Sequence, residues 1–311
     1  MQPQTEQLIS LALQEDLAFG DLTSQAIFPA THRSSARLLA REDLVLCGIA
    51  VAKRVFERVD PALKINCLAR DGQSLQAGEA IMQLEGSTIA LLSAERTALN
   101  FLQRLSGIAT QAKRFADVAR AVQNGACEAR TNKSGVTQVG VRIADTRKTT
   151  PGWRALEKYA VRCGGCYNHR FSLGEHVMIK DNHVAAAGSI SKAVAAARQA
   201  APHLSRIEVE ADTLRQVDAA VAAGADVILL DNMQPAQIRT AVQRIAGRAL
   251  VEISGGVNLN NLADYVLPGV DVISIGALTH SAVAADLSMD IVVRKAPTAA
   301  LTKSARKPAQ R

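Results

Sequence analysis

The sequence has few aromatic residues, few cysteines and no long hydrophobic run, and each scarcity narrows the class of protein. Aromatics make up 3% of the 311 residues although hydrophobic residues make up 48%, a balance typical of helices packed on a buried parallel sheet. Five scattered cysteines do not suggest a disulfide framework. Without an apolar run of about 18 residues or a signal-like N-terminus, we expect no membrane span and a cytoplasmic protein.

Acidic residues are absent from the end of the chain, and this explains most of the net charge of +7. Residues 294–311 carry six Lys and Arg and no Asp or Glu, so residues 1–293 have a formal charge of only +1. A basic end rich in Ala, Pro and Ser is typical of a disordered tail. The body therefore has no general electrostatic surface for nucleic acid.

The first part of the chain predicts a small α/β domain. Short apolar runs between residues 35 and 85 alternate with turns, with a helix expected at Ala50–Val59. A further helix is predicted from a Ser93 cap to Gly107, followed by another from Thr110 to Val122. Residues 123–141 lack periodicity and are predicted to form a loop or hairpin.

The later part repeats a strand followed by a helix, with strand starts roughly 20 residues apart. Polar residues end four consecutive predicted strands: Ile207–Glu210, Val227–Asp231, Ala249–Ser254 and Val272–Gly276. Parallel strands with functional ends on one face are typical of a (β/α) barrel. A doubly wound open sheet contains the same local units and is the alternative, but its functional residues gather at one switch point. The pattern therefore favours the barrel.

Residues 145–183 hold an unusual density of positive charge beside glycine turns. A solvated helix would intersperse its charges at helical spacing and would not need these turns. Cations beside glycines instead suggest a site for a small polyanion. The basic residues of this segment are Arg147, Lys148, Arg154, Lys158, Arg162, Arg170 and Lys180, with His169, His176 and His183 among them.

Two carboxylates and two glycine loops follow the predicted barrel strands. Glu210 and Asp231 end adjacent strands and could hold Mg²⁺, bind ribose hydroxyls or stabilise an oxocarbenium charge; salt bridges to barrel lysines are the simpler alternative. Glu208 and Asp226 fall at less suitable positions. The loops Ser254-Gly255-Gly256 and Gly276-Ala277 suit a phosphate, although such glycines can also simply shape turns.

Cys163 and Cys166 form a CxxC pattern three residues before His169. A zinc site would need a second pair of ligands at matching spacing, and the sequence contains no second CxxC. A metal or redox role is therefore the minor hypothesis, and turn geometry is the main one.

Several long motifs together make the chain similar to the quinolinate phosphoribosyltransferase family over about residues 8–290. The strings are AERTALNFLQRLSGIAT (94–110), DTRKTTPG (145–152), LEKYAVRCGG (156–165), NHR (168–170), MIKDNH (178–183), EVEAD (208–212), ILLDN (228–232) and SIGALTHS (274–281). The resemblance implies an N-terminal α/β sandwich domain (1–108, joined by 281–293), an incomplete (β/α) barrel (109–280) and a tail (294–311). It also implies a homodimer or higher oligomer.

The resemblance further implies decarboxylating transfer of phosphoribose from phosphoribosyl pyrophosphate to quinolinate, with Mg²⁺ as cofactor. Arg147 and Arg170 would clamp the two quinolinate carboxylates with help from His169 and Lys180, and Arg96 would reach across the dimer. The remaining expected roles are substrate phosphate for Lys148, ribose and Mg²⁺ for Glu210 and Asp231, and the 5′-phosphate for Ser254, Gly255, Gly256, Gly276 and Ala277. Arg154, Lys158 and Arg162 are expected to be structural, and a relative that binds without catalysing remains the rival hypothesis.

Overall fold

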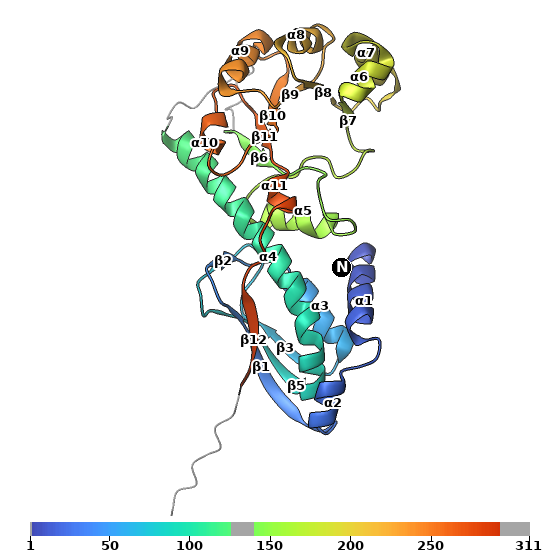
Figure 1. The fold of residues 1–311 in the computed structure, drawn as a ribbon, viewed down its shortest axis with the longest axis vertical. Coiled ribbons are helices and arrows are strands. Elements are labelled where there is room, and N and C mark those ends of the chain that lie inside the picture. Colours follow the sequence, from blue (N-terminus) through green and yellow to red (C-terminus); the bar gives the residue numbers. More distant parts are fainter. Residues whose placement is uncertain (1, 126–139, 293–311) are drawn as a thin grey trace, which may run out of the picture.

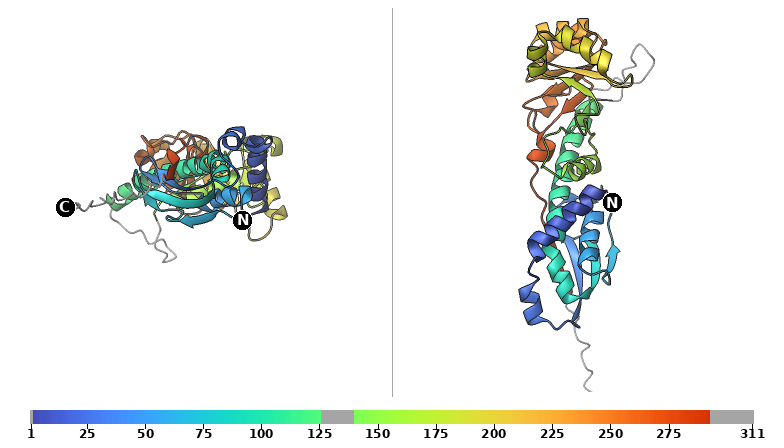
Figure 2. Two further views of the ribbon diagram at one scale, coloured as in Figure 1. Left: turned by 90° about the horizontal axis from the view of Figure 1, so that it is seen from below. Right: turned by 90° about the vertical axis from the view of Figure 1, so that its right-hand side faces the viewer.

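The computed structural model describes residues 2–125 and 140–292, which form two lobes joined by one long helix (Figure 1). The lobes follow one another along the longest axis of the molecule, and α4 (Thr88–Gly125) runs from one into the other (Figure 2). Most of the predicted 123–141 loop and the whole of 294–311 lie outside the described residues. Within the described residues, no helix is both long and apolar enough to cross a membrane.

The N-terminal lobe contains a four-stranded antiparallel sheet with the order β12-β1-β5-β3. On β1 the buried Ala36, Leu38 and Ala40 alternate with the exposed Arg37, because successive side chains of a strand point to opposite faces. The predicted strands and the helix of this lobe are confirmed. Its elements are α1 (Pro3–Leu17), α2 (Leu22–Ile27), β1 (Arg33–Ala40), β2 (Leu44–Val45), α3 (Ile49–Val59), β3 (Lys64–Cys67), β4 (Ser74–Leu75), β5 (Ala80–Ser87) and β12 (Leu287–Val292).

The long helix α4 corrects the prediction of two shorter helices. It begins at Thr88, ahead of the predicted Ser93 cap, and continues through Gly107. Gly107 serves a close approach and does not end the helix, because a Cβ at this position would lie 2.0 Å from the carbonyl oxygen of Val283. Ser93 instead donates a hydrogen bond from Oγ to Asp21 Oδ2 at 3.0 Å, which fixes α4 to the segment before α2.

The C-terminal lobe is an incomplete (β/α) barrel of parallel strands, as predicted. Its six-stranded sheet has the order β6-β11-β10-β9-β8-β7, so the first strand lies beside the last and the gap falls between β6 and β7. In a doubly wound sheet the order of the parallel strands would instead reverse at a switch point. The strands are β6 (Arg142–Ala144), β7 (Val177–Ile179), β8 (Ile207–Ala211), β9 (Val227–Asp231), β10 (Leu250–Ser254) and β11 (Val272–Ser274).

Helices follow the barrel strands and cover the outside of the sheet (Figure 1). Val209 and Ile253 are fully buried on their strands, as expected for strands covered by helices. The barrel helices are α5 (Arg154–Cys163), α6 (Asp181–Ala187), α7 (Ile190–Ala200), α8 (Leu214–Ala222), α9 (Pro235–Ile245), α10 (Leu262–Tyr265) and α11 (Ala277–His280).

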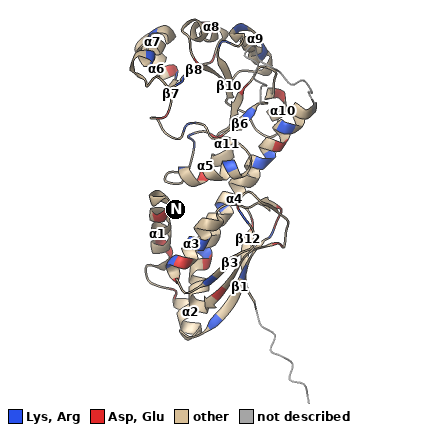
Figure 3. Cartoon of the chain, turned by 180° about the vertical axis from the view of Figure 1, so that it is seen from behind, with Lys and Arg blue, Asp and Glu red and all other residues tan. Residues whose placement is uncertain are grey.

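Lys and Arg lie on both lobes with acidic residues among them (Figure 3). On α4, for example, Lys113 pairs with Asp117 at 2.9 Å, and Arg54 on α3 pairs with Glu6 at 2.9 Å. Such exposed pairs contribute little to stability. The charged side chains that distinguish this fold are therefore those gathered inside the barrel.

Candidate active site

A pocket of about 410 Å³ lies at the C-terminal ends of the barrel strands. This is the end at which the loops of a (β/α) barrel build a binding site. Its wall combines four cations, two carboxylates and several small polar groups. The lining residues are Thr146, Arg147, Lys148, His169, Arg170, Met178, Lys180, Glu210, Leu229, Asp231, Ser254 and Ser274.

The strand residues of the pocket follow the two-residue period of a β-strand. Leu229 and Asp231 on β9 both line the pocket, and the final residues of β10 and β11, Ser254 and Ser274, line it beside them. Because alternate residues share one face, these side chains point into the barrel while their neighbours meet the helices. Applied strand by strand, this period would have found Leu229 and Ser274, which the sequence analysis missed.

The cations Arg147, Lys148, Arg170 and Lys180 come from three separate loops to one pocket, as the basic segment predicted. Arg170 is 9% exposed, and its guanidinium donates to the carbonyl oxygen of His176 at 2.8 Å. Burial and then the charge of Arg147 lower the pKa of Arg170. Two guanidinium groups held close together in this way favour an anion between them.

Each of the two glycine loops lies close to a polar side chain: the Gly276 loop to Lys148, and the Gly255 loop to Asn232. A Cβ on Gly276 would lie 2.9 Å from Lys148 Cδ, so a larger residue would push the lysine aside. Gly255, at φ +92°, would place a Cβ 2.2 Å from Asn232 Oδ1. Of the five predicted phosphate-loop residues only Ser254 lines the pocket; Gly255, Gly256, Gly276 and Ala277 are not among its lining residues.

Glu210 and Asp231 lie together in the pocket with Asp212 beside them, their carboxylate oxygens within 4.8 Å of one another. Burial raises the pKa of Asp231, and the charges of Glu210 and Asp212 raise it further. Such a cluster suits a hard divalent cation. Lys180 Nζ pairs with Glu210 Oε2, so the salt bridge that the sequence analysis kept as an alternative is also present.

Asp145, which is fully buried behind the pocket, organises the segment that carries His169 and Arg170. Its carboxylate pairs with Lys158 Nζ, and it accepts hydrogen bonds from Asn168 Nδ2 at 2.6 Å and from the His169 main-chain N–H at 2.9 Å. Lys158 is 3% exposed and also donates to the His169 carbonyl oxygen at 2.9 Å. Lys158 is therefore structural, as predicted.

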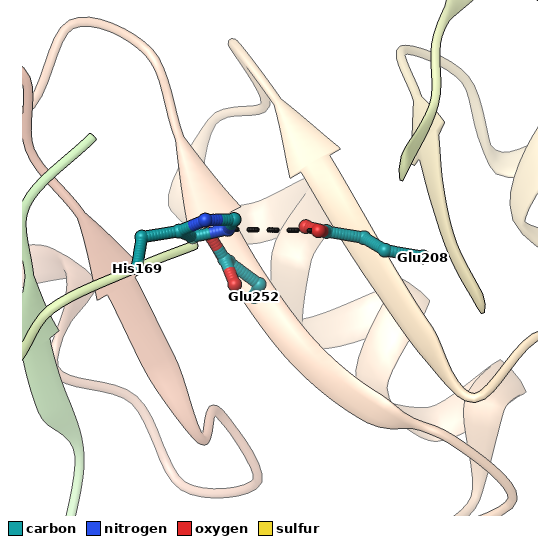
Figure 4. A group of neighbouring side chains, drawn as sticks. All are labelled: His169, Glu208 and Glu252. Atoms are coloured by element: carbon teal, nitrogen blue, oxygen red, sulfur yellow. Dashed lines mark ion pairs between the residues drawn. The ribbon is translucent and has the colours of Figure 1, made fainter. Parts of the chain in front are cut away.

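His169 lies between two buried carboxylates in the barrel interior, as Figure 4 shows. Its Nε2 is 3.5 Å from Glu208 Oε2 and 3.3 Å from Glu252 Oε1. Burial alone would lower the pKa of His169, but hydrogen bonds to the two carboxylates and their charges raise it to about 10. Glu208, whose position in the sequence is less suitable than that of Glu210, does not line the pocket but faces His169. Glu252 was not predicted, although each of the two carboxylates stands two residues before a pocket residue of its strand.

Arg96 and the CxxC cysteines lie apart from this pocket. Arg96 is an exposed residue of α4 in the N-terminal lobe and is not among the lining residues. Cys166 Sγ donates to the Ala112 carbonyl oxygen at 3.1 Å, whereas Cys163 interacts with the side chain of Cys47. A Cβ on Gly164 would lie 2.3 Å from the Ala109 carbonyl oxygen, so Gly164 permits close packing on α4. Gly165 has φ +88°, which agrees with the turn geometry of the main hypothesis.

Comparison with known proteins agrees with this architecture. The family described as "Quinolinate phosphoribosyl transferase, N-terminal domain" matches residues 21–106, and the corresponding C-terminal domain matches residues 108–290. The chain belongs to the quinolinate phosphoribosyltransferase family.

Members of this family with a curated name are similar to the chain over almost its whole length. It is 43% identical to the probable nicotinate-nucleotide pyrophosphorylase [carboxylating] of Bacillus subtilis over 290 residues, which cover 93% of this chain and 94% of the relative. Identity to the Mycobacterium leprae nicotinate-nucleotide pyrophosphorylase [carboxylating] is also 43%, covering 91% and 95%. The NadC crystal structure from Streptococcus pyogenes matches with a TM-score of 0.83 at 38% identity, covering 94% and 99% of the two chains.

Proposed function

We propose that this chain transfers phosphoribose from phosphoribosyl pyrophosphate to quinolinate, releasing pyrophosphate and CO₂ and giving nicotinate mononucleotide for NAD synthesis. The observation that carries this conclusion is the gathering of four cations and two carboxylates in one pocket of a chain that belongs to the family. We expect the reaction to take place in the cytoplasm.

The pocket matches the charge of both substrates. Quinolinate carries two adjacent carboxylates, and planar guanidinium groups can bind carboxylates through paired hydrogen bonds. Arg147 and Arg170 are the two guanidinium groups that line the pocket, and Lys180 lies beside them. We assign the carboxylate clamp to these arginines, and the phosphate groups of the second substrate to Lys148 with the loops at Ser254–Gly256 and Gly276–Ala277.

The chemistry requires mainly positioning and electrostatic stabilisation. The pyridine nitrogen attacks ribose C1, the bond to pyrophosphate breaks, and positive charge develops on the ribose. Glu210 and Asp231 are the carboxylates placed to stabilise that charge. The product ring is a pyridinium, which accepts the electron pair of the breaking C–C bond as the 2-carboxylate leaves as CO₂, and a proton then replaces it on the ring carbon.

Magnesium fits the acidic side of the pocket. Glu210 and Asp231, with Asp212 adjacent, offer the oxygen ligands that this ion prefers. When bound, the ion would neutralise charge on the pyrophosphate group. Removing divalent cations with a chelator should abolish turnover, and adding Mg²⁺ should restore it; full activity in the chelator would contradict a magnesium requirement.

The proposed activity is tested by incubating the protein with quinolinate, phosphoribosyl pyrophosphate and Mg²⁺ and measuring CO₂ and nicotinate mononucleotide. We expect both products in equal amounts and no CO₂ when phosphoribosyl pyrophosphate is omitted. Quinolinate binding without turnover would favour the rival hypothesis of a non-catalytic relative. Turnover of nicotinate but not of quinolinate would favour a different phosphoribosyltransferase.

We also propose that the protein acts as a homodimer or higher oligomer in which Arg96 enters the pocket of the neighbouring subunit. Arg96 is exposed and lies outside the pocket of its own chain. Large apolar side chains are exposed in the same lobe: Phe19 at 101%, Leu22 at 81% and Ile27 at 63%. Exposed apolar groups of this size are typical of protein contacts.

Complementation tests the shared site. Arg96→Ala and Arg147→Ala should each be nearly inactive alone, because each lacks one cation in every pocket. Mixed subunits would contain one pocket with both arginines intact, so activity should reappear on mixing and reach about a quarter of the wild-type value. Two inactive variants that stay inactive after verified subunit exchange would refute the assignment of Arg96.

A further inference from the structure

Two buried carboxylates in the barrel interior have no role in the assignments above. Glu208 on β8 and Glu252 on β10 are 6% and 4% exposed, and both face His169, which lines the pocket (Figure 4). The His169 segment bridges to β6, so the ring reaches across the interior to two other strands. The three side chains thus connect opposite parts of the barrel wall beneath the pocket.

These carboxylates are poorly satisfied by the rest of the protein. Among the described residues, Glu208 Oε1 and Glu252 Oε1 are buried and form no well-aligned hydrogen bond, although Glu252 Oε1 lies 3.3 Å from His169 Nε2. Glu157, which is also fully buried, accepts hydrogen bonds from Arg104 at 2.8 Å and from Thr150 Oγ1 at 2.8 Å. A buried, incompletely paired carboxylate lowers the stability of the fold by several kcal/mol. Glu208 and Glu252 are such groups, and His169 is the main partner that offsets this loss.

Both ring nitrogens of His169 have polar neighbours that hold the ring in place. Nε2 faces the two carboxylates, and Nδ1 accepts a hydrogen bond from the Arg170 main-chain N–H at 2.7 Å. The position of the ring is therefore coupled to the main chain of Arg170, whose guanidinium lines the pocket. A displacement of the ring would therefore also displace Arg170, one of the two arginines of the proposed carboxylate clamp.

We propose that Glu208 and Glu252 are positioning residues that anchor His169, and through it Arg170, in the geometry that binds quinolinate. The inference rests on the proposed function of the pocket, and it adds two residues that do not line the pocket themselves. It predicts that these carboxylates affect quinolinate binding selectively, with little effect on phosphoribosyl pyrophosphate.

A double-mutant cycle between Glu252 and His169 tests this coupling. Glu252 is chosen over Glu208 because Glu208 lies two residues from Glu210, so a substitution of Glu208 would also disturb the carboxylates of the pocket. Glu252→Leu should weaken quinolinate binding about tenfold in the wild-type background and have almost no effect in a His169→Ala background, because residues that act through one another are not additive. Glu252→Gln keeps an oxygen acceptor and should recover most of the affinity. Quinolinate affinity is measured by calorimetry, with the KM for phosphoribosyl pyrophosphate and the melting temperature measured on every variant.

Two results would overturn the proposal. One is an equal loss of quinolinate affinity for Glu252→Leu with and without His169. The other is a parallel loss for both substrates, which would indicate a general effect on the barrel. If Glu252→Leu does not fold, a cycle built from Glu252→Gln and His169→Ala tests the same coupling, with smaller expected changes in quinolinate affinity. Wild-type protein that fails to turn over quinolinate would refute the proposed function itself, whereas wild-type turnover with additive variants would refute only this inference.

Discussion

Lys148 and Lys158 lie ten residues apart in the same basic segment, yet they have opposite surroundings. Lys158 is 3% exposed and is held by Asp145 and the His169 carbonyl oxygen. Lys148 is exposed, lines the pocket and packs beside Gly276. The density of charge therefore identifies the segment, whereas the partners of each cation decide whether it supports the fold or faces a ligand.

Other basic residues of the segment divide in the same way. Arg154 donates to Thr149 Oγ1 at 3.0 Å and to the Phe171 carbonyl oxygen at 3.2 Å, and Arg162 lies 5.2 Å from the centre of the Tyr167 ring. Both residues therefore make structural contacts, as predicted. Arg147, Arg170 and Lys180 instead reach the pocket beside Lys148.

The largest expected effect is on stability, from Lys158→Ala. Its removal leaves Asp145 buried without its cation, and breaking a buried pair costs about 3–5 kcal/mol. Urea unfolding measures this loss. Lys113→Ala is the matched control, because Lys113 pairs with Asp117 at the surface and should cost at most about 1 kcal/mol. Equal losses for the two variants would contradict the structural role that burial gives to Lys158.

Lys148→Ala should have the opposite consequence, a loss of activity without a loss of stability. Removing a group that stabilises charge in a transition state lowers kcat/KM about 10²- to 10³-fold. The unfolding free energy should change by less than about 0.5 kcal/mol because the side chain is exposed. Lys192→Ala, an exposed lysine on α7, is the control and should retain full activity. Normal kcat/KM in Lys148→Ala would remove this residue from the site.

The pH dependence of stability examines the cluster of His169, Glu208 and Glu252, which is buried inside the barrel and reaches the pocket through His169. The pKa of His169 is raised from an ordinary 6.5 to about 10; because Nδ1 accepts a hydrogen bond from the Arg170 N–H, the extra proton is shared among Nε2 and the two carboxylates. The folded cluster therefore retains a proton that the unfolded chain releases. The resulting stability is fully present below about pH 6.5 and is lost as pH rises toward 10, by an amount on the order of a few kcal/mol.

Urea unfolding at pH 6, 8 and 10 checks this dependence, with His169→Gln as the comparison. The variant should be less stable at pH 6 and should lose less stability between pH 6 and 10 than the wild type. Parallel curves for the two proteins would show that the cluster does not retain the extra proton.

The smallest expected effect is that of Arg154→Ala, which removes hydrogen bonds from a partly exposed structural cation. Removing such a hydrogen bond lowers the free energy of unfolding by about 0.5–1.5 kcal/mol. Thermal unfolding measures the stability, and kcat should fall less than in Lys148→Ala, since Arg154 does not line the pocket. A larger effect on activity than that of Lys148→Ala would reverse the proposed roles.

The repeating strand pattern was enough to predict the barrel and the end at which the pocket forms. Polar residues at Glu210, Asp231 and Ser254 end consecutive parallel strands, and such ends meet on one face. The basic segment predicted the cations of the pocket for a different reason. Its residues lie close together along the chain, so only local loops were needed to bring them to the same place.

Contacts between distant parts of the chain could not be predicted in this way. Gly107 follows a helical stripe and looks like a terminator until the approach of Val283 is known. Glu252 is a single acid within an apolar strand, and its meaning depends on a histidine 83 positions earlier in the sequence. We propose that Arg96 acts in the pocket of a second chain, and neither a local pattern nor a single subunit can test that role.

The carboxylate clamp assigned to Arg147 is tested by calorimetric titration of quinolinate into wild-type protein, Arg147→Ala and Arg142→Ala. Arg147 follows the C-terminal end of β6 and lines the pocket, whereas the exposed Arg142 begins the same strand at its other end. We predict that Arg147→Ala weakens binding more than about tenfold, as expected for loss of a charged hydrogen-bond partner, and that Arg142→Ala binds like the wild type. Equal affinity in all three proteins would show that Arg147 does not bind the quinolinate carboxylates.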